Sequence, residues 1–190
     1  LIKKIRETSL APISVDTYYP EVAEAAIQAG ATMINDIKGL DTPGMVEVLA
    51  QYPEVQVVIM HSRKHQSLSL KEELHQFYTE KIEQCQKYGL SLEKICFDPG
   101  IGFHKTVAEN LQLLKDPNAF RYQDYPLLYG VSRKRTIGAL TNEPEPANRD
   151  FGSAAASLYA AQQGVEILRV HNVQGLKQTF DVWRALSEKE

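Results

Sequence analysis

The chain has 190 residues, of which 43% are hydrophobic and 24% charged, and its formal net charge at pH 7 is -3. This is the composition of a globular protein large enough to bury a core without metal or disulfide support, so we expect one domain over residues 1–190. The acidic balance and the lack of a basic run make nucleic acid a poor candidate partner. Cys85 and Cys96 form no CxxC pair and every apolar stretch is strand-sized, which excludes a zinc finger, a disulfide framework and a membrane span. We therefore expect a cytoplasmic protein that binds no membrane.

Short β-branched runs alternate along the chain with longer segments whose apolar residues recur at spacings of three and four. The runs predict six strands, at residues 13–16, 33–37, 55–60, 95–97, 127–131 and 166–170. The longer segments predict helices at residues 1–7, 20–29, 43–51, 70–88, 108–114, 151–163 and 173–188. The strands lack polar alternation, as buried parallel strands do. The sequence therefore predicts repeated βα units.

Two α/β architectures are built from such units, the TIM (β/α)8 barrel and the doubly wound open sheet. A doubly wound sheet commonly begins with a glycine-rich phosphate turn, and the sequence contains neither GxGxxG nor a P-loop. Polar residues instead follow all six predicted strands, which is how a barrel enzyme assembles its site. We therefore predict a barrel. Because a barrel has eight units and the chain starts with Leu1 rather than Met, we expect these six to be its last βα units, with the two N-terminal units absent.

Two carboxylates and an amide stand at the ends of separate strands. Asp16, Asn35 and Asp98 together offer the acceptors and donors that would bracket a flat heterocycle. A single Asp at a strand end is more often a helix N-cap. Three such groups at one barrel mouth favour ligand binding instead.

Basic residues follow the last two strands. Arg169 and His171 alternate along one strand, so their side chains point to the same side, and beside Arg133 and Lys134 they would form a cationic pocket for phosphate or pyrophosphate. The competing interpretation is a solvated basic surface with a core histidine. The position after consecutive late strands, a usual phosphate site in barrels, leaves the two interpretations equally weighted.

Two further loops deserve a functional interpretation. Residues 98–106 form a glycine-rich segment whose Phe103 is able to cover a bound ring, although a plain strand-to-helix turn explains its glycines equally well. His61 and His65 lie in a basic segment, but no nearby acid or cysteine completes a metal site there. We expect a solvated loop at residues 61–65.

These motifs together resemble dihydropteroate synthase, a folate-pathway barrel family that joins a pterin to para-aminobenzoate. The resemblance runs from about Pro12 to the end, through PISVDT, GATMINDIKG, VVIMH, FDPGIGFHKT, YGVSRK and ILRVHNV. VDT and IND also fit the pterin-binding domains of methyltetrahydrofolate methyltransferases, whereas SRK followed by RVH is typical of the synthases. Two alternatives stay open, a pterin-binding module of the methyltransferase type and an inactive barrel fragment.

The resemblance implies a transferase that condenses 6-hydroxymethyl-7,8-dihydropterin pyrophosphate with para-aminobenzoate to give 7,8-dihydropteroate and pyrophosphate. The residues it implies for pterin binding are Asp16, Asn35, Met60, Asp98 and Lys134. Those it implies for pyrophosphate are Arg169 and His171, and those bordering para-aminobenzoate are Phe103, Ser132 and Lys134. The implied catalytic residues are Lys134, Asp98 and Arg169. An anionic pterin pocket and a cationic clamp would stabilise the charges that separate as pyrophosphate leaves.

The resemblance also implies Mg2+, which would neutralise the departing pyrophosphate. The family's magnesium-binding Asn belongs to the absent N-terminal part, so we expect no metal ligand in this chain. A homodimer and sensitivity to sulfonamides are implied as well, with the small-residue segment at Gly152 as a candidate dimer contact. The chain departs from the family at Arg135, often serine, and at Asn172, often aspartate. Without the first two βα units we expect the chain alone either to be inactive or to be completed by residues outside this sequence.

Overall fold

The computed structural model describes residues 1–64 and 68–187. They form two compact units, one of Leu1–Asp98 with Tyr122–Tyr125 and the other of Pro99–Arg121 with Pro126–Glu190. Within the described residues, no helix combines the length and the apolar character needed to cross a membrane.

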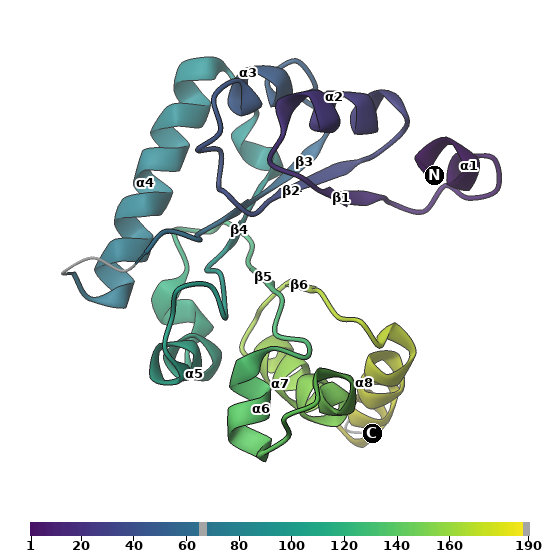
Figure 1. The fold of residues 1–190 in the computed structure, drawn as a ribbon, viewed down its shortest axis with the longest axis vertical. Coiled ribbons are helices and arrows are strands. Elements are labelled where there is room, and N and C mark those ends of the chain that lie inside the picture. Colours follow the sequence, from purple (N-terminus) through teal and green to yellow (C-terminus); the bar gives the residue numbers. More distant parts are fainter. Residues whose placement is uncertain (65–67, 188–190) are drawn as a thin grey trace. The chain divides into compact units, whose positions relative to one another are not determined.

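The first unit is built on a four-stranded parallel sheet. Its strands lie side by side in chain order, as β1 (Ser14–Asp16), β2 (Met33–Asp36), β3 (Gln56–Met60) and β4 (Ile95–Asp98). The helices of this unit are α1 (Ile2–Arg6), α2 (Pro20–Gln28), α3 (Met45–Leu49) and α4 (Leu70–Tyr88), with a 3-10 turn at Leu92–Lys94. Figure 1 shows α2, α3 and α4 on the same side of the sheet. Each crossover therefore returns the chain to the next position in a parallel sheet.

Local capping sets the ends of α4. The Ser69 hydroxyl accepts the Glu72 N–H over 3.3 Å while the Glu72 carboxylate accepts the Ser69 N–H over 3.0 Å, a reciprocal capping box. At the other end Gly89 takes a left-handed conformation with φ +74°, which a residue without Cβ adopts at little cost. The helix therefore spans the predicted residues 70–88.

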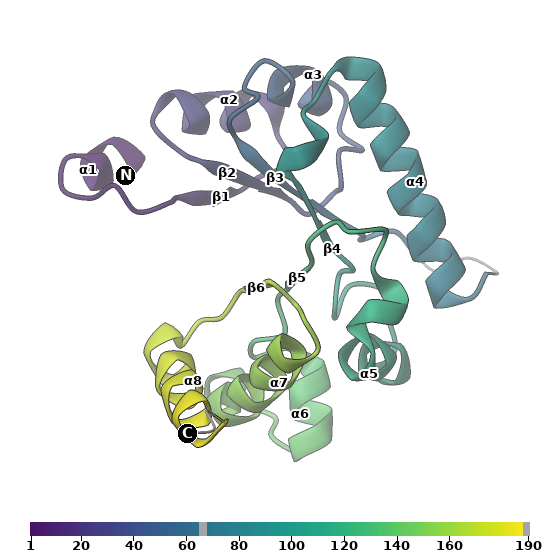
Figure 2. The ribbon, with the colours of Figure 1, turned by 180° about the vertical axis from the view of Figure 1, so that it is seen from behind.

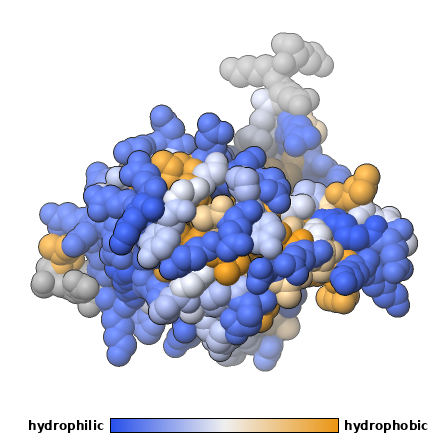
Figure 3. Space-filling model, turned by 90° about the horizontal axis from the view of Figure 1, so that it is seen from above, coloured by the Kyte–Doolittle hydropathy of each residue, from blue (hydrophilic) through white to orange (hydrophobic). Residues whose placement is uncertain are grey.

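The core of the first unit lies between the sheet and these helices. Phe97 of β4 packs against Tyr78 of α4 with their ring centroids 4.2 Å apart, and Ile34, Val57 and Ile59 are buried on the same face of the sheet. The helices turn polar residues outward. Figure 3, which looks onto them, shows a mostly hydrophilic surface with small separate apolar patches. Burial of one stripe on each helix thus covers one face of the sheet.

The second unit contains two short parallel strands, β5 (Leu128–Tyr129) and β6 (Ile167–Leu168), which pair with each other. Its helices are α5 (Val107–Lys115), α6 (Arg135–Thr141), α7 (Asp150–Gln162) and α8 (Val173–Ser187), with 3-10 turns at Pro117–Phe120 and Pro146–Arg149. Figure 2 shows α7 and α8 side by side. The strands β5 and β6 lead directly into the loops that carry the predicted basic residues.

The α/β class, the six strands and their parallel pairing are confirmed. The last two strands are shorter than predicted, with two residues each, and helix α6 was not predicted. The sequence of α6 contains threonine and glycine, which are poor helix formers, but Gly138 packs on the Arg149 guanidinium, where a Cβ would lie 2.7 Å from Cζ. A tertiary contact therefore overrides local propensity. The last residue of the predicted final helix, Glu188, lies outside the described residues.

Candidate functional site

Four of the predicted pterin residues share one face of the sheet in the first unit. Asp16 pairs with Asn35, Asn35 pairs with Val58, and Met60 pairs with Asp98. Partners in a parallel register project to the same face, and so do residues two apart in one strand, such as Val58 and Met60. The four side chains therefore stand together at the carboxyl ends of four adjacent strands, on the face opposite Phe97 and the helices.

The side-chain amide of Asn35 is held in one orientation. Its Nδ2 donates to Asp16 Oδ1 over 3.0 Å, and the residue is only 3% exposed. Its Oδ1 is buried and meets no hydrogen-bond donor among the described residues. A buried acceptor of this kind costs free energy unless it is paired. The arrangement thus leaves Oδ1 able to accept a further hydrogen bond.

The neighbouring Asp36 has a structural role on the other face. Its carboxylate accepts the N–H of Lys38 over 2.8 Å and that of Leu40 over 2.9 Å. Burial raises the pKa of Asp36 above its ordinary value, although these two hydrogen bonds oppose the rise. Asp36 therefore fixes the turn that follows Asn35 and takes no part in the polar face.

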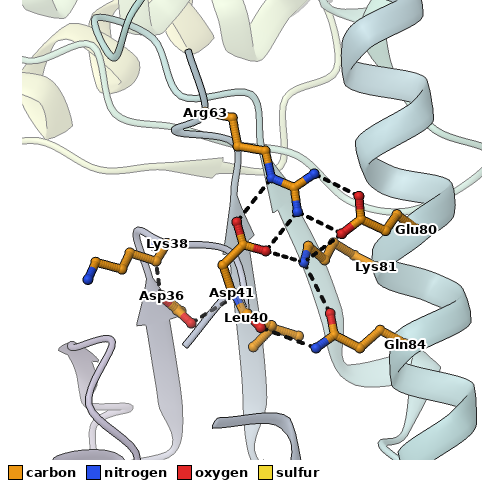
Figure 4. A network of polar contacts seen from close by, with 8 residues as sticks. All are labelled: Asp36, Lys38, Leu40, Asp41, Arg63, Glu80, Lys81 and Gln84. Atoms are coloured by element: carbon orange, nitrogen blue, oxygen red, sulfur yellow. Dashed lines mark hydrogen bonds and ion pairs between the residues drawn. The ribbon is translucent and has the colours of Figure 1, made fainter. Parts of the chain in front are cut away.

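An ion-pair network ties the loops after β2 and β3 to helix α4 (Figure 4). The Arg63 guanidinium contacts both oxygens of Asp41, over 2.7 and 3.0 Å, and both of Glu80, over 2.6 and 2.7 Å. The buried ammonium of Lys81 reaches Asp41 over 2.5 Å and Gln84 over 3.1 Å. This network is not predictable from sequence spacing, because charges far apart in the chain are equally typical of solvated loops.

The same network shifts the titration of its carboxylates. Burial would raise the pKa of Asp41, but hydrogen bonds from Arg63 and Lys81 outweigh it and hold that pKa below its ordinary value. The hydrogen bond from Arg63 likewise lowers the pKa of Glu80. Both carboxylates are therefore held in the charged form.

The prediction of a solvated loop is wrong at His61. This side chain is 2% exposed and meets the edge of Phe77, with ring centroids 5.0 Å apart. Its Nε2 lies 3.6 Å from a carboxylate oxygen of Glu73, and its backbone N–H donates to the Asp98 carbonyl over 2.9 Å. His61 thus continues the path of β3 under α4. The other histidine of the motif, His65, lies outside the described residues.

In the second unit, Asn110 of α5 organises the glycine-rich loop that precedes this helix. Its Oδ1 accepts the Gly102 N–H over 2.7 Å, and its Nδ2 donates to the carbonyls of Thr106, over 2.8 Å, and Lys105, over 3.3 Å. Asn110 is itself 2% exposed. The sequence motifs predict no role for Asn110. A buried asparagine beside a glycine-rich turn nevertheless often holds a loop through hydrogen bonds to its backbone.

Lys134 is held against the same loop. Its ammonium donates to the Ile101 carbonyl and lies 4.7 Å from the centroid of the Phe103 ring, a cation–π contact. The stem of Lys134 passes so close to Gly102 that a Cβ there would lie 2.9 Å from Lys134 Cδ. The structure thus brings together two residues predicted to border para-aminobenzoate, Phe103 and Lys134.

The predicted pyrophosphate residues gather at the ends of β5 and β6. A Cβ on Gly130 would lie 3.9 Å from Lys134 Nζ and 4.0 Å from Arg169 Cβ, so these two basic residues flank Gly130. The hydroxyl of Ser132 lies 3.0 Å from Nδ1 of His171 and accepts its backbone N–H over 3.2 Å. We call Lys134 and Arg169, which flank Gly130, the basic group of this unit, and Ser132 and His171 form a pair.

Arg133 does not contribute to this basic group in the predicted way. Its guanidinium forms two hydrogen bonds with Asp150, over 2.7 and 2.9 Å, so its charge is compensated within the protein. The hydrogen bonds from Arg133 lower the pKa of Asp150, which also accepts Asn172 Nδ2 over 3.3 Å. Sequence spacing does not reveal this partner, because Asp150 lies 17 residues away from Arg133.

Comparison with known proteins identifies the family. The family model described as pterin binding enzyme matches residues 1–171. The chain is 37% identical to the dihydropteroate synthase of Synechocystis over 195 residues, covering 98% of this chain and 67% of that protein. It is also 37% identical to the Escherichia coli dihydropteroate synthase over 187 residues, covering 94% of this chain and 66% of the relative. The chain thus spans about two thirds of the length of these curated relatives.

Solved structures agree with these relatives. A dihydropteroate synthase from Xanthomonas albilineans, in complex with 7,8-dihydropteroate, matches all of this chain and 74% of its own with a TM-score of 0.93 and 39% identity. The same enzyme with 4-aminobenzoic acid matches with a TM-score of 0.92 and 40% identity, covering 100% of this chain and 72% of that one. From its sequence and its fold alike, the chain belongs to the pterin binding enzymes and, among them, to the dihydropteroate synthases, which are transferases of folate biosynthesis.

Proposed function

We propose that this chain provides the pterin and pyrophosphate sites of a dihydropteroate synthase, which joins 6-hydroxymethyl-7,8-dihydropterin pyrophosphate to para-aminobenzoate and releases pyrophosphate. The observation that carries the proposal is the polar face of β1–β4, where Asp16, Asn35, Met60 and Asp98 stand together. The complexes of the Xanthomonas enzyme with 7,8-dihydropteroate and with 4-aminobenzoic acid support it.

The polar face of the first unit suits a pterin ring. A pterin presents ring and amino N–H donors at its edge, and the carboxylates of Asp16 and Asp98 are acceptors for them. The buried Oδ1 of Asn35 would accept another donor, and Met60 offers an apolar contact for the flat face of the ring. Two carboxylates would also stabilise the positive charge that develops on the pterin methylene carbon.

The basic group of the second unit suits the leaving group. In the proposed reaction the bond from the methylene carbon to the pyrophosphate oxygen breaks, and pyrophosphate leaves with the electron pair. The arylamine nitrogen of para-aminobenzoate then bonds to the carbon and releases a proton. Arg169 and His171 would hold the pyrophosphate, and Lys134 would lie near the reacting carbon. In this proposal Lys134, Asp98 and Arg169 are the catalytic residues.

Phe103 and Ser132 would border para-aminobenzoate, together with Lys134. The contact between the Lys134 ammonium and the Phe103 ring supports a shared place for the two residues in this subsite. Sulfonamides resemble para-aminobenzoate in shape and charge, so we propose that they compete for the same subsite.

We also propose that the two units belong to a single domain, a TIM (β/α)8 barrel in which this chain supplies six βα units. The parallel pairing of the strands, their order along the chain and the polar residues at their carboxyl ends support this architecture. A cytoplasmic location is part of the same proposal.

Magnesium is proposed as the cofactor, to neutralise charge on the departing pyrophosphate. The part of the chain described by the structure contains no group of three or more His, Cys, Asp and Glu side chains that could hold a metal ion. The proposal assigns no step and no ligand of this chain to the metal.

We propose a homodimer through the face formed by α7 and α8. A groove of about 950 Å³ lies between these helices, lined by Leu158, Leu176 and Trp183 among others. Phe151 at its edge is 92% exposed, and Val182 and Leu186 are also exposed. An apolar groove with large exposed apolar residues favours association with a second copy. The predicted contact at Gly152 lies next to this face but packs against Ile137 within the unit.

Two measurements on the protein test the proposed function. The first is release of pyrophosphate from the pterin pyrophosphate in the presence of para-aminobenzoate and magnesium. The second is calorimetric titration of the pterin pyrophosphate into the wild-type protein and into Arg169→Ala, with binding at least tenfold weaker in the variant. Equal binding of the pterin compound by the wild-type protein and by Arg169→Ala would instead identify a pterin-binding module. A folded protein that binds neither the pterin compound nor para-aminobenzoate would be an inactive barrel chain.

A further inference from the structure

Ser132 and His171 form a hydrogen-bonded pair in the second unit. The Ser132 hydroxyl oxygen lies 3.2 Å from the backbone nitrogen of His171 and 3.0 Å from its ring Nδ1. Ser132 is 6% exposed, whereas the His171 imidazole belongs to an exposed residue. Among the described residues, neither side chain has another hydrogen-bond partner.

The backbone contact decides how the hydroxyl is used. A backbone N–H is always a donor, so Ser132 Oγ must accept from the His171 backbone. The hydroxyl proton then needs an acceptor, and Nδ1 of His171 is the acceptor that the described structure offers. A buried hydroxyl that donates in this way satisfies both of its roles, whereas one that accepts twice leaves its proton unpaired.

This geometry fixes the tautomer of a neutral imidazole. If Nδ1 accepts from Ser132, the ring proton of neutral His171 lies on Nε2, which then acts as a donor toward solvent or a ligand. The same two contacts also restrain the ring, because one hydroxyl group holds both the backbone and the side chain of one residue. An imidazole oriented by a second residue is a recurring way to present an N–H to an anion.

We propose that Ser132 is a positioning residue for His171, which keeps Nε2 protonated and directs its N–H toward the pyrophosphate oxygens. The inference rests on the proposed function, and it adds a role to the one that the resemblance implied for Ser132. Both of the hydroxyl's contacts in the described structure go to His171, so Ser132, which would border the para-aminobenzoate subsite, also acts on the leaving-group side.

Nitrogen NMR of the histidine rings gives a direct test. In the wild-type protein near neutral pH, we expect the neutral His171 ring to show an unprotonated Nδ1 and a protonated Nε2, assigned with His171→Gln. In Ser132→Ala the ring should become a mixture of both tautomers, and in Ser132→Thr, which restores a hydroxyl, it should return to the wild-type form. A protonated Nδ1 in the wild-type protein would overturn the proposal.

Binding of inorganic pyrophosphate supplies a second readout. We expect Ser132→Ala to weaken it about three- to tenfold, the effect of one or two lost hydrogen bonds. In a His171→Ala background the same change should have no further effect, because Ser132 acts through His171. Equal losses in both backgrounds would contradict the positioning role. If Ser132→Thr fails to fold, this double-mutant comparison still decides the matter.

Ser153→Ala is the matched control. Ser153 is also a buried serine of the second unit that accepts a backbone N–H, that of Arg133, but it makes no contact with His171. Its removal should leave the ring tautomer and the pyrophosphate affinity unchanged. If the wild-type protein and Arg169→Ala both fail to bind pyrophosphate, the proposed function fails, while the nitrogen spectrum still decides the tautomer.

Discussion

Asn35 on β2 donates a hydrogen bond from Nδ2 to Asp16 Oδ1 on β1, over 3.0 Å, and this contact leaves the carbonyl oxygen of the same amide buried without a donor. The pair joins two strands at the polar face, and it occupies Nδ2 of the amide in a hydrogen bond within the protein. In the proposed function the other side of the amide accepts from the pterin. We therefore expect Asp16 and Asn35 to act together in binding.

Asn35→Ala should weaken pterin binding about tenfold to a hundredfold, because it removes the buried acceptor and also the hydrogen bond that Asn35 donates to Asp16. Titration calorimetry with a pterin measures the effect. Asn118→Ala is the control, since Asn118 donates to the Gln163 carbonyl at an exposed position of the second unit. Equal pterin affinity in wild-type protein and Asn35→Ala would remove Asn35 from the site.

Gly102→Ala should reduce turnover, because a Cβ at this position would lie 2.9 Å from Lys134 Cδ and push the lysine away from Ile101 and Phe103. Gly89→Ala is matched to it, since both glycines have φ near +80° but nothing lies within 4 Å of the Gly89 Cβ position. We expect each variant to lose about 1 kcal/mol of stability from the left-handed conformation. Turnover is measured in steady-state assays. An equal loss of turnover in both variants would argue against the contact with Lys134.

Asp41→Asn should destabilise the first unit by about 1–3 kcal/mol, because it takes a charged partner from the buried Lys81 ammonium and from Arg63. Urea unfolding measures the change. Asp181→Asn breaks an exposed ion pair with Lys177 on α8 and should cost only about 0.3–0.5 kcal/mol. A smaller effect at Asp41 than at Asp181 would show that the network adds nothing to stability.

Arg63→Met should weaken the dependence of folding stability on pH in the acid range. The pKa values of Asp41 and Glu80 are held below their ordinary values of 3.8 and 4.5 in the folded protein. Their contribution to stability is therefore complete above these ordinary values and is lost as the pH falls through the lower folded values. The unfolding temperatures of the wild-type protein and the variant, measured between about pH 3 and pH 6, should differ most at the higher pH values. Burial raises the pKa of Asp36, so its effect on stability changes with pH in the opposite direction. This effect is the same in the wild-type protein and in the variant. Parallel profiles would be inconsistent with the network.

Phe151→Asp should shift the protein toward the monomer, because Phe151 is 92% exposed at the edge of the groove between α7 and α8. Sedimentation velocity reports the change. Leu140→Asp alters another exposed apolar residue, on α6 and outside the residues that line the groove, and should leave the mass unchanged. A monomeric wild-type protein would rule out the proposed dimer.

Periodicity was enough to predict the βα units and the strand ends that bear Asp16, Asn35 and Asp98. Alternation along a strand further predicts that residues two apart share a face, but only the register between strands shows that Met60 joins the other three. The loop at residues 98–106 was predicted as glycine-rich, whereas its attachment to Asn110 depends on a tertiary contact.

Charges were the least predictable part of the chain. Arg63 resembles a solvated side chain in the sequence, and its two carboxylate partners lie 22 and 17 residues away. Arg133 resembles a pocket cation, but Asp150 compensates its charge. Partners at such separations meet only through the fold, so sequence spacing does not reveal them.

The shared face of Asp16, Asn35, Met60 and Asp98 limits how this chain can change in length. A single residue inserted within β2 before Asn35 would reverse the alternation beyond it, so that the amide would point to the helix side and Ile34 or the inserted residue would take its place. The loops between strands and helices bear no such constraint. Insertions and deletions should therefore accumulate in the loops of related sequences and be purged from within the strands.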